Sequence, residues 1–125
     1  MRVVLADSES RVRFALLSLL EEQSGVTVVG EASDCQGLLA QTRVACPDLV
    51  LIDWDLPGMT GSDVIAELQA TCPHVRTIAL GSRPEAEPEA LAAGVDSFVS
   101  KAGPPEPLLA AIHLVQELYG RRERQ

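Results

Sequence analysis

Positive charge is scarce in this chain, and its scarcity narrows what the chain can bind. The 125 residues include 10 Lys and Arg against 18 Asp and Glu, which gives a formal net charge of −8. A nucleic-acid-binding surface usually gathers positive charge, so we expect no direct nucleic-acid binding by this domain. The one basic cluster, Arg121, Arg122 and Arg124, lies at the very end. We expect it to be a solvated tail or the start of a linker.

Long apolar runs are also lacking. The apolar run that follows Arg2 covers only a few residues, which is too short for a signal peptide or a membrane span. The chain shows no repeat, no low-complexity segment and no interdomain linker. We therefore predict one domain over residues 1–120, with a basic tail or linker start at 121–125. We expect it to be cytoplasmic and without a membrane partner. We expect no further domain within the residues after Tyr119, so the chain is expected to be either a stand-alone domain or a segment that ends in a linker.

Cysteine is infrequent. Cys35, Cys46 and Cys72 are odd in number and lack the close spacing of a metal site. This pattern favours three reduced, mostly buried thiols over a metal site or a disulfide.

Short apolar segments alternate with helical patterns along the chain. The predicted strands cover residues 2–6, 26–32, 49–53, 75–80 and 96–100. A helix is predicted after each strand, from the spacing of apolar residues and from capping residues. The first is expected to be capped by Ser8, and the second to begin at Ser33 or Asp34. The later helices are expected from Gly61 to near Pro73, from Pro84 to Ala93 with a Gly94 cap, and from Pro105 to Tyr119.

This alternation predicts an α/β fold in which helices cover both faces of a parallel sheet. Five strands in a chain of 125 residues favour a flavodoxin-like, doubly wound sheet of order 2-1-3-4-5 with five helices. A dinucleotide-binding fold would require a glycine-rich turn after the first strand. Residues 7–10 read Asp-Ser-Glu-Ser and contain no glycine, which argues against such a site.

Polar residues stand where the predicted strands end. Asp7 follows the first strand, Asp53 ends the third with Asp55 two residues later, Ser82 follows the fourth, and Lys101, the chain's only lysine, follows the fifth. These ends share one edge of a parallel sheet. Close carboxylates require a proton or a cation among them, hard oxygen ligands suit Mg²⁺, and a lysine offers a point charge to a phosphoryl oxygen. The set predicts phosphoryl transfer with a carboxylate as the acceptor.

The run from Asp53 to Gly61, Asp-Trp-Asp-Leu-Pro-Gly-Met-Thr-Gly, resembles the Asp-x-x-Leu/Met-Pro-x-Met-x-Gly motif of response-regulator receiver domains of two-component signalling, the CheY-like superfamily. The opening Val-Val-Leu-Ala-Asp and the segment from Ala92 to Lys101 fit the same family. The resemblance implies that Asp53 accepts a phosphoryl group from a histidine kinase in the presence of Mg²⁺, and that this changes how the domain binds a partner.

The resemblance also assigns the other site residues. Asp7 would hold Mg²⁺ together with Asp53, and Asp55 would offer its backbone carbonyl to the metal. Lys101 would contact the acyl phosphate, and Phe98 stands at the aromatic position that turns inward on activation. The face from the fourth strand to the last helix would bind effectors or a second copy. No catalytic activity is expected beyond hydrolysis of the domain's own acyl phosphate.

The sequence departs from the family pattern at two positions. Ser8 stands where the family has a second acid that binds Mg²⁺, so metal affinity should fall. Gly81 stands where the family has a Thr or Ser that senses the phosphate, and Ser82 beside it is a candidate phosphate contact. Two functions stay open: a phosphorylatable receiver, and a pseudo-receiver that serves as a phosphorylation-independent docking or dimerisation module. A flavin-phosphate binder is disfavoured, because three acids near the site would repel an anion.

Overall fold

A single parallel sheet forms the centre of the computed structural model, which describes residues 1–123 and the side chains of residues 1–120. Its strands are β1 (Arg2–Ala6), β2 (Thr27–Ala32), β3 (Leu49–Asp53), β4 (Arg76–Gly81) and β5 (Ser97–Ser100). They lie in the order β2-β1-β3-β4-β5, and every neighbouring pair is parallel. The predicted fold and strand order are confirmed. The basic residues predicted as a tail, 121–125, fall outside the described side chains.

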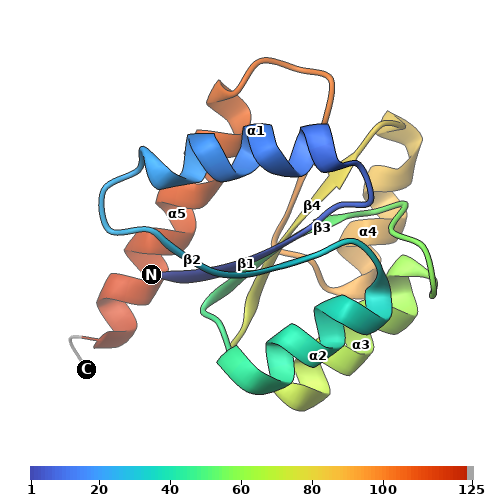
Figure 1. Cartoon of the computed structure of the whole chain (residues 1–125), viewed down its shortest axis with the longest axis horizontal. Helices are drawn as coiled ribbons and strands as arrows, with labels where there is room; N and C mark the ends of the chain where they lie inside the picture. The colour runs from blue at the N-terminus through green and yellow to red at the C-terminus, as the bar shows by residue number, and fades with distance from the viewer. Residues whose placement is uncertain (124–125) are drawn as a thin grey trace.

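Five helices cover the two faces of this sheet, as predicted. They are α1 (Ser10–Glu21), α2 (Cys35–Ala45), α3 (Gly61–Thr71), α4 (Glu87–Ala93) and α5 (Glu106–Glu123), and a 3₁₀ turn over Pro84–Ala86 leads into α4. Helices α1 and α5 lie on one face of the sheet, and α2, α3 and α4 lie on the other (Figure 1).

The helix ends follow the capping signals with one correction. Asp34 caps α2, because its Oδ1 accepts the N–H of Gly37 at 2.7 Å, and Gly94 ends α4 with a left-handed φ of 109°. We had expected Ser8 to cap α1, but this prediction is wrong. The residue at the N-cap position is Glu9. The Asp7 carboxylate accepts the Glu9 N–H at 2.9 Å, which forms a turn and shifts the start of the helix by one residue.

The middle strand is buried along its whole length, which is why it reads as an unbroken apolar run. Leu49 and Leu51 pack with α1 and α5, whereas Val50 and Ile52 pack with α2, α3 and α4. Side chains of successive strand residues point to opposite faces, so a strand covered on both faces must be apolar at every position. Asp53 then ends this strand at the edge of the core.

The prediction of three reduced thiols is wrong for two of them. Cys46 and Cys72 form a disulfide, with Cα atoms 5.9 Å apart, while Cys35 is a buried free thiol. Residues 46 and 72 directly follow α2 and α3, and these two neighbouring helices end at the same edge of the sheet (Figure 1). A separation of 26 residues in sequence gave no sign of this proximity.

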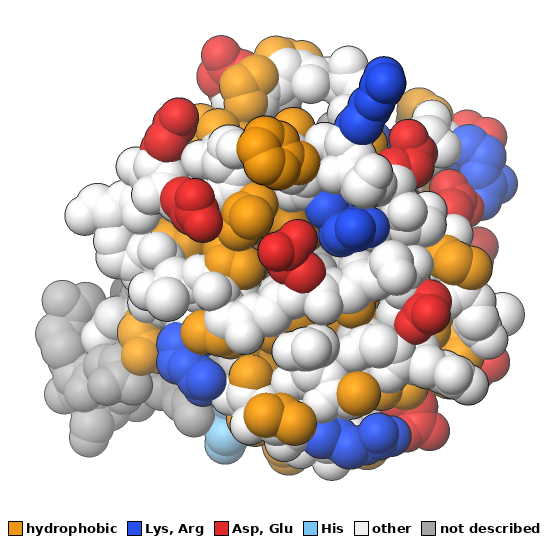
Figure 2. Space-filling model, in the orientation of Figure 1, with side chains coloured by type: hydrophobic (Ala, Val, Ile, Leu, Met, Phe, Trp, Pro, Cys, Tyr) orange, Lys and Arg blue, Asp and Glu red, His pale blue; other side chains and the backbone are white. Residues whose placement is uncertain are grey.

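Charges of both signs are mixed on the surface in the orientation of Figure 1, where Lys and Arg side chains stand apart among Asp and Glu (Figure 2). Within residues 1–123, no helix has the length and apolar character needed to cross a bilayer.

Candidate functional site

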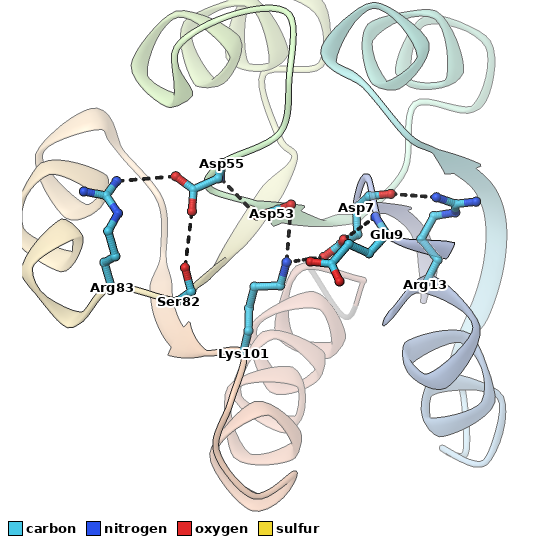
Figure 3. A network of polar contacts seen from close by, with 8 residues as sticks. All are labelled: Asp7, Glu9, Arg13, Asp53, Asp55, Ser82, Arg83 and Lys101. Carbon is cyan, nitrogen blue, oxygen red and sulfur yellow. Dashed lines mark hydrogen bonds and ion pairs between the residues drawn. The ribbon is translucent and has the colours of Figure 1, made fainter. Parts of the chain in front are cut away.

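An ion-pair cluster forms at the carboxyl edge of the sheet. The Lys101 Nζ atom lies 2.8 Å from Asp7 Oδ2 and 3.3 Å from Asp53 Oδ2 (Figure 3). The two aspartates meet because β1 and β3 are neighbours, with Ala6 paired to Ile52. Lys101 joins them because its N–H donates to the Gly81 carbonyl at 3.0 Å, which extends the pairing of β5 with β4. The structure thus brings together three residues that the sequence separates by up to 94 positions (101 − 7).

Burial sets the electrostatics of this cluster. Asp7 is fully buried and Asp53 is 3% exposed. Burial raises the pKa of Asp53, and the nearby charge of Asp7 adds to this, although the Asp55 N–H at 3.0 Å and Lys101 act in the opposite direction. Burial by itself lowers the pKa of Lys101, but contact with Asp7 and the charge of Asp53 outweigh this and the pKa is raised. Lys101 therefore stays an ammonium ion that offsets the two carboxylates.

One buried oxygen in the cluster lacks a hydrogen-bond donor. Asp7 Oδ1 accepts the Glu9 N–H, whereas Asp7 Oδ2 has no hydrogen-bond partner among the described residues. Its contact with Lys101 is short enough for an ion pair but does not have the angles of a hydrogen bond. Among the described residues its one charged partner is the Lys101 ammonium, so this carboxylate oxygen can also serve as a ligand to a divalent cation.

The side chain of Asp55 points away from this cluster toward the loop after β4 (Figure 3). Its Oδ2 lies 3.5 Å from Ser82 Oγ and its Oδ1 lies 3.4 Å from Arg83 Nη2. Sequence reasoning missed Arg83, although it is the only cation in the loop from Ser82 to Pro84 and follows a strand end at the same edge. Arg13 was also missed; its guanidinium donates to the Asp7 carbonyl at 2.8 Å.

An open pocket lies beside the ion-pair cluster. Its volume is 300 Å³, and Ser8, Glu9, Asp53, Ser82 and Lys101 contribute to its lining. It offers a nucleophilic carboxylate, an ammonium ion and hydroxyl groups to a small anionic group. This combination suits the transfer of a phosphoryl group to Asp53.

The ring of Phe98 is turned inward and lies over Gly81. A Cβ atom built on Gly81 would come within 2.7 Å of Phe98 Cε2, and closer still to Cζ. The half-buried ring also packs against the hydrophobic cluster on the face of α2, α3 and α4. It thus occupies the space that a side chain at residue 81 would need.

Comparison with known families explains why these residues occur together. Residues 3–113 match the response regulator receiver domain family. The chain belongs to this family. The resemblance that the Asp53–Gly61 run indicated is therefore confirmed for the receiver domain as a whole.

Curated relatives of the receiver domain are response regulators and transcriptional activators. It is 32% identical to the transcriptional activator protein ExaE of Pseudomonas putida, over 92% of this chain and 55% of that protein. It is 30% identical to the nitrate/nitrite response regulator protein NarL of Escherichia coli K12, over 89% of this chain and 52% of that protein. The chain spans about half the length of the curated relatives it matches.

Solved structures share the fold closely. A LuxR-family two-component response regulator from Aurantimonas sp. SI85-9A1 is 28% identical with a TM-score of 0.83, and covers 91% of this chain and 83% of its own. The receiver domain of the putative response regulator NarL from Mycobacterium tuberculosis is 28% identical with a TM-score of 0.82, over 92% of this chain and 95% of its own. RcsB from Salmonella enterica serovar Typhimurium, bound to the promoter rprA with the phosphomimetic BeF₃⁻, is 26% identical with a TM-score of 0.86, over 94% of this chain and 60% of its own.

The residues present fit a weakly held divalent cation. Asp7 and Asp53 supply two carboxylates, which are the hard oxygen ligands that Mg²⁺ takes, and among the described residues Asp7 Oδ2 has Lys101 as its one charged partner. Ser8 replaces the second acid of the family pattern with an uncharged hydroxyl. The site therefore has few charged ligands. Within the described residues, no group of three His, Cys, Asp or Glu side chains has the arrangement of a metal site.

Proposed function

We propose that this receiver domain accepts a phosphoryl group on Asp53 from a partner histidine kinase. The observation that carries the proposal is the Lys101 ammonium held between Asp7 and Asp53. An Asp53 oxygen attacks the phosphorus of the kinase phosphohistidine, an acyl phosphate P–O bond forms, and the P–N bond breaks so that the imidazole leaves and takes up a proton. Lys101 then contacts a phosphoryl oxygen. Water can later hydrolyse this acyl phosphate, and no other catalysis is proposed.

Mg²⁺ would be held by Asp7 and Asp53, with the backbone carbonyl of Asp55. When bound, it neutralises charge on the phosphoryl oxygens. Because Ser8 supplies no charge, most of the remaining shell would be water. Ser82 lines the same pocket and can donate its hydroxyl to the phosphoryl group.

The proposed output is a changed affinity, for a partner or a second copy, of the face that extends from β4 through α4 and β5 to α5. Such a switch requires the partner to bind the two states unequally. Leu114 on α5 is 55% exposed, and Leu91 on α4 is 48% exposed. Leu109 and Leu118 on α5 are half-buried. RcsB, a structural relative, is seen bound to a promoter with a phosphomimetic, and we propose a transcriptional output of this kind for the protein that carries the domain.

The test uses acetyl phosphate or beryllofluoride with Mg²⁺. We expect intact-mass measurement to show the gain of one phosphoryl group from acetyl phosphate, and Trp54 fluorescence to change with either reagent, since Trp54 follows Asp53 directly. The Asp53→Asn variant should show neither effect. Equal mass gain in Asp53→Asn would reject Asp53 as the acceptor, and no gain in the wild type at millimolar Mg²⁺ would reject the proposal.

A second candidate is a pseudo-receiver that docks or dimerises without phosphorylation. The observation in its favour is that Gly81 has no hydroxyl and that the Phe98 ring fills its place. In this case, partner binding or dimerisation would be the same for the wild type and Asp53→Asn, with and without acetyl phosphate. A difference between them would reject the pseudo-receiver.

A further inference from the structure

Two cysteines join the ends of neighbouring helices, far from the acceptor pocket. Cys46 caps the end of α2, where its N–H donates to the Thr42 carbonyl at 2.8 Å. Cys72 caps the end of α3, where its N–H donates to the Leu68 carbonyl at 2.8 Å. Their Cα atoms are 5.9 Å apart, within the range that a disulfide spans. Both lie at the amino edge of the sheet, before β3 and β4, whereas Asp53 lies at the carboxyl edge.

The two cysteine residues differ in their access to solvent. Cys46 is exposed and Cys72 is 3% exposed. The backbone of Cys46 has a φ of 39°, the only positive value at a non-glycine position among the described residues. The thiolate is the attacking form in thiol–disulfide exchange, and a small disulfide reaches a cysteine at an exposed position more readily than one at a buried position.

We propose that Cys46 and Cys72 form a reversible thiol–disulfide site that exchanges with small disulfides of the glutathione type. The Cys46 thiolate attacks one sulfur of the small disulfide, an S–S bond forms to Cys46, and one small thiolate leaves. The Cys72 thiolate then attacks Cys46 Sγ and expels the second small thiolate. The two cysteines lose two electrons in total, the small disulfide gains them, and the leaving thiolates take up the two protons.

The third cysteine provides an internal contrast. Cys35 is 1% exposed, and its Sγ lies 3.6 Å from the Leu56 carbonyl in the loop after β3. Burial raises the pKa of the Cys35 thiol, which disfavours the thiolate. Cys35 therefore stays reduced under conditions that oxidise the pair.

Closing the link restricts the unfolded chain over a separation of 26 residues. A loop of this size favours the folded state on the order of 100-fold in the unfolding equilibrium. The link ties α2 to α3 at the edge of the sheet opposite the acceptor pocket, so it acts on the stability of this helix pair and does not obstruct the pocket.

The experiment equilibrates the whole chain with reduced or oxidised glutathione, then counts thiols by maleimide labelling in denaturant with intact-mass detection. We expect three labels after reduced glutathione and one after oxidised glutathione, from the 3 cysteines. The Cys35→Ser variant should take two labels after reduced glutathione and no label after oxidised glutathione. Cys72→Ser should trap one glutathione on Cys46, whereas Cys46→Ser should trap none, because Cys72 is buried.

Two further readings decide the outcome. The wild type should unfold at a higher urea concentration after oxidised than after reduced glutathione, and Cys46→Ser should not respond. Cys46 is exposed, so this variant is expected to fold even if Cys72→Ser does not. Three labels under both conditions would overturn the proposal, and so would the loss of a label from Cys35 in place of the pair.

Discussion

The ring of Phe98 on β5 covers Gly81 at the end of β4, and the two positions are sterically coupled. The space beside the Gly81 Cα is filled by ring atoms, so a side chain at residue 81 and an inward Phe98 exclude each other. Gly81 has no positive φ in the described structure, so this glycine is required by the ring and not by the backbone.

Replacing Gly81 by threonine should therefore expel the Phe98 ring or strain it. We expect a loss of about 1–3 kcal/mol in the free energy of unfolding, measured in urea, and a changed NMR environment of the Phe98 ring protons. In a Phe98→Ala background, the same substitution should cost much less. Gly103→Ala is the control, because its Cβ would meet nothing closer than 3.7 Å. Equal losses at Gly81 in both backgrounds would contradict the coupling.

Removing the ammonium from the cluster should destabilise the domain. In Lys101→Met, Asp7 and Asp53 stay buried without their cation, and we expect a loss on the order of 3 kcal/mol near neutral pH. The loss should shrink in acid, because the raised pKa of Asp53 lets its carboxylate take up a proton there. Arg83→Met is the matched control, since its ion pair with Asp55 is 57% and 49% exposed and should contribute less than about 1 kcal/mol. Similar losses of stability in Lys101→Met and Arg83→Met would show that burial does not make the Lys101 ion pairs more important for stability than an exposed ion pair.

The raised pKa of Asp53 predicts a pH-dependent effect of Asp53→Asn. Burial favours the protonated carboxyl in the folded state, so the stability that it contributes is present below the ordinary Asp pKa of about 3.9 and is lost as pH rises through the raised value. Asparagine does not titrate. The variant should therefore gain stability relative to the wild type between acidic and neutral pH, as measured by urea unfolding at both. Glu67→Gln, which removes an exposed carboxylate on α3, should show no comparable gain.

Restoring the missing acid should strengthen Mg²⁺ binding. Ser8→Asp adds a carboxylate to the pocket that Asp53 and Lys101 also line, and we expect the Mg²⁺ affinity to rise at least about tenfold. The readout is Trp54 fluorescence during Mg²⁺ titration, because Trp54 is the only tryptophan and is 6% exposed. Ser18→Asp, on an exposed position of α1, adds the same charge away from the site. If Ser8→Asp and Ser18→Asp bind Mg²⁺ equally, the pocket does not use an acid at residue 8.

Local patterns were enough to predict the sheet and the meeting of Asp7, Asp53 and Lys101. The apolar run before Asp53 and the alternation of strands with helices set the strand order, and parallel strands place their carboxyl ends along one edge. These features depend on periodicity and topology, both of which the sequence carries directly.

Features that depend on tertiary distance were not predictable in this way. The Cys46–Cys72 pair forms because α2 and α3 end side by side. The Arg83–Asp55 pair forms because the two side chains point toward each other. Neither arrangement can be read from the sequence. Gly81 could be recognised as unusual, but only packing shows that Phe98 fills its place. Serine is a favourable residue type for a helix cap, which is why Ser8 was expected to be one. In the structure the Asp7 carboxylate accepts the Glu9 N–H, and the helix begins one residue later.

The disulfide and Asp53 lie at opposite edges of the sheet, which one short strand spans. β3 runs for five residues, which at about 3.3 Å per residue separates the two edges by roughly 16 Å. In a Cys72→Ser background, Cys46 thus offers an attachment point for a dye or a solid support. A fluorophore or an immobilising tether placed there would leave the Asp53 pocket open to reagents, so the proposed phosphoryl transfer could be followed on single anchored molecules.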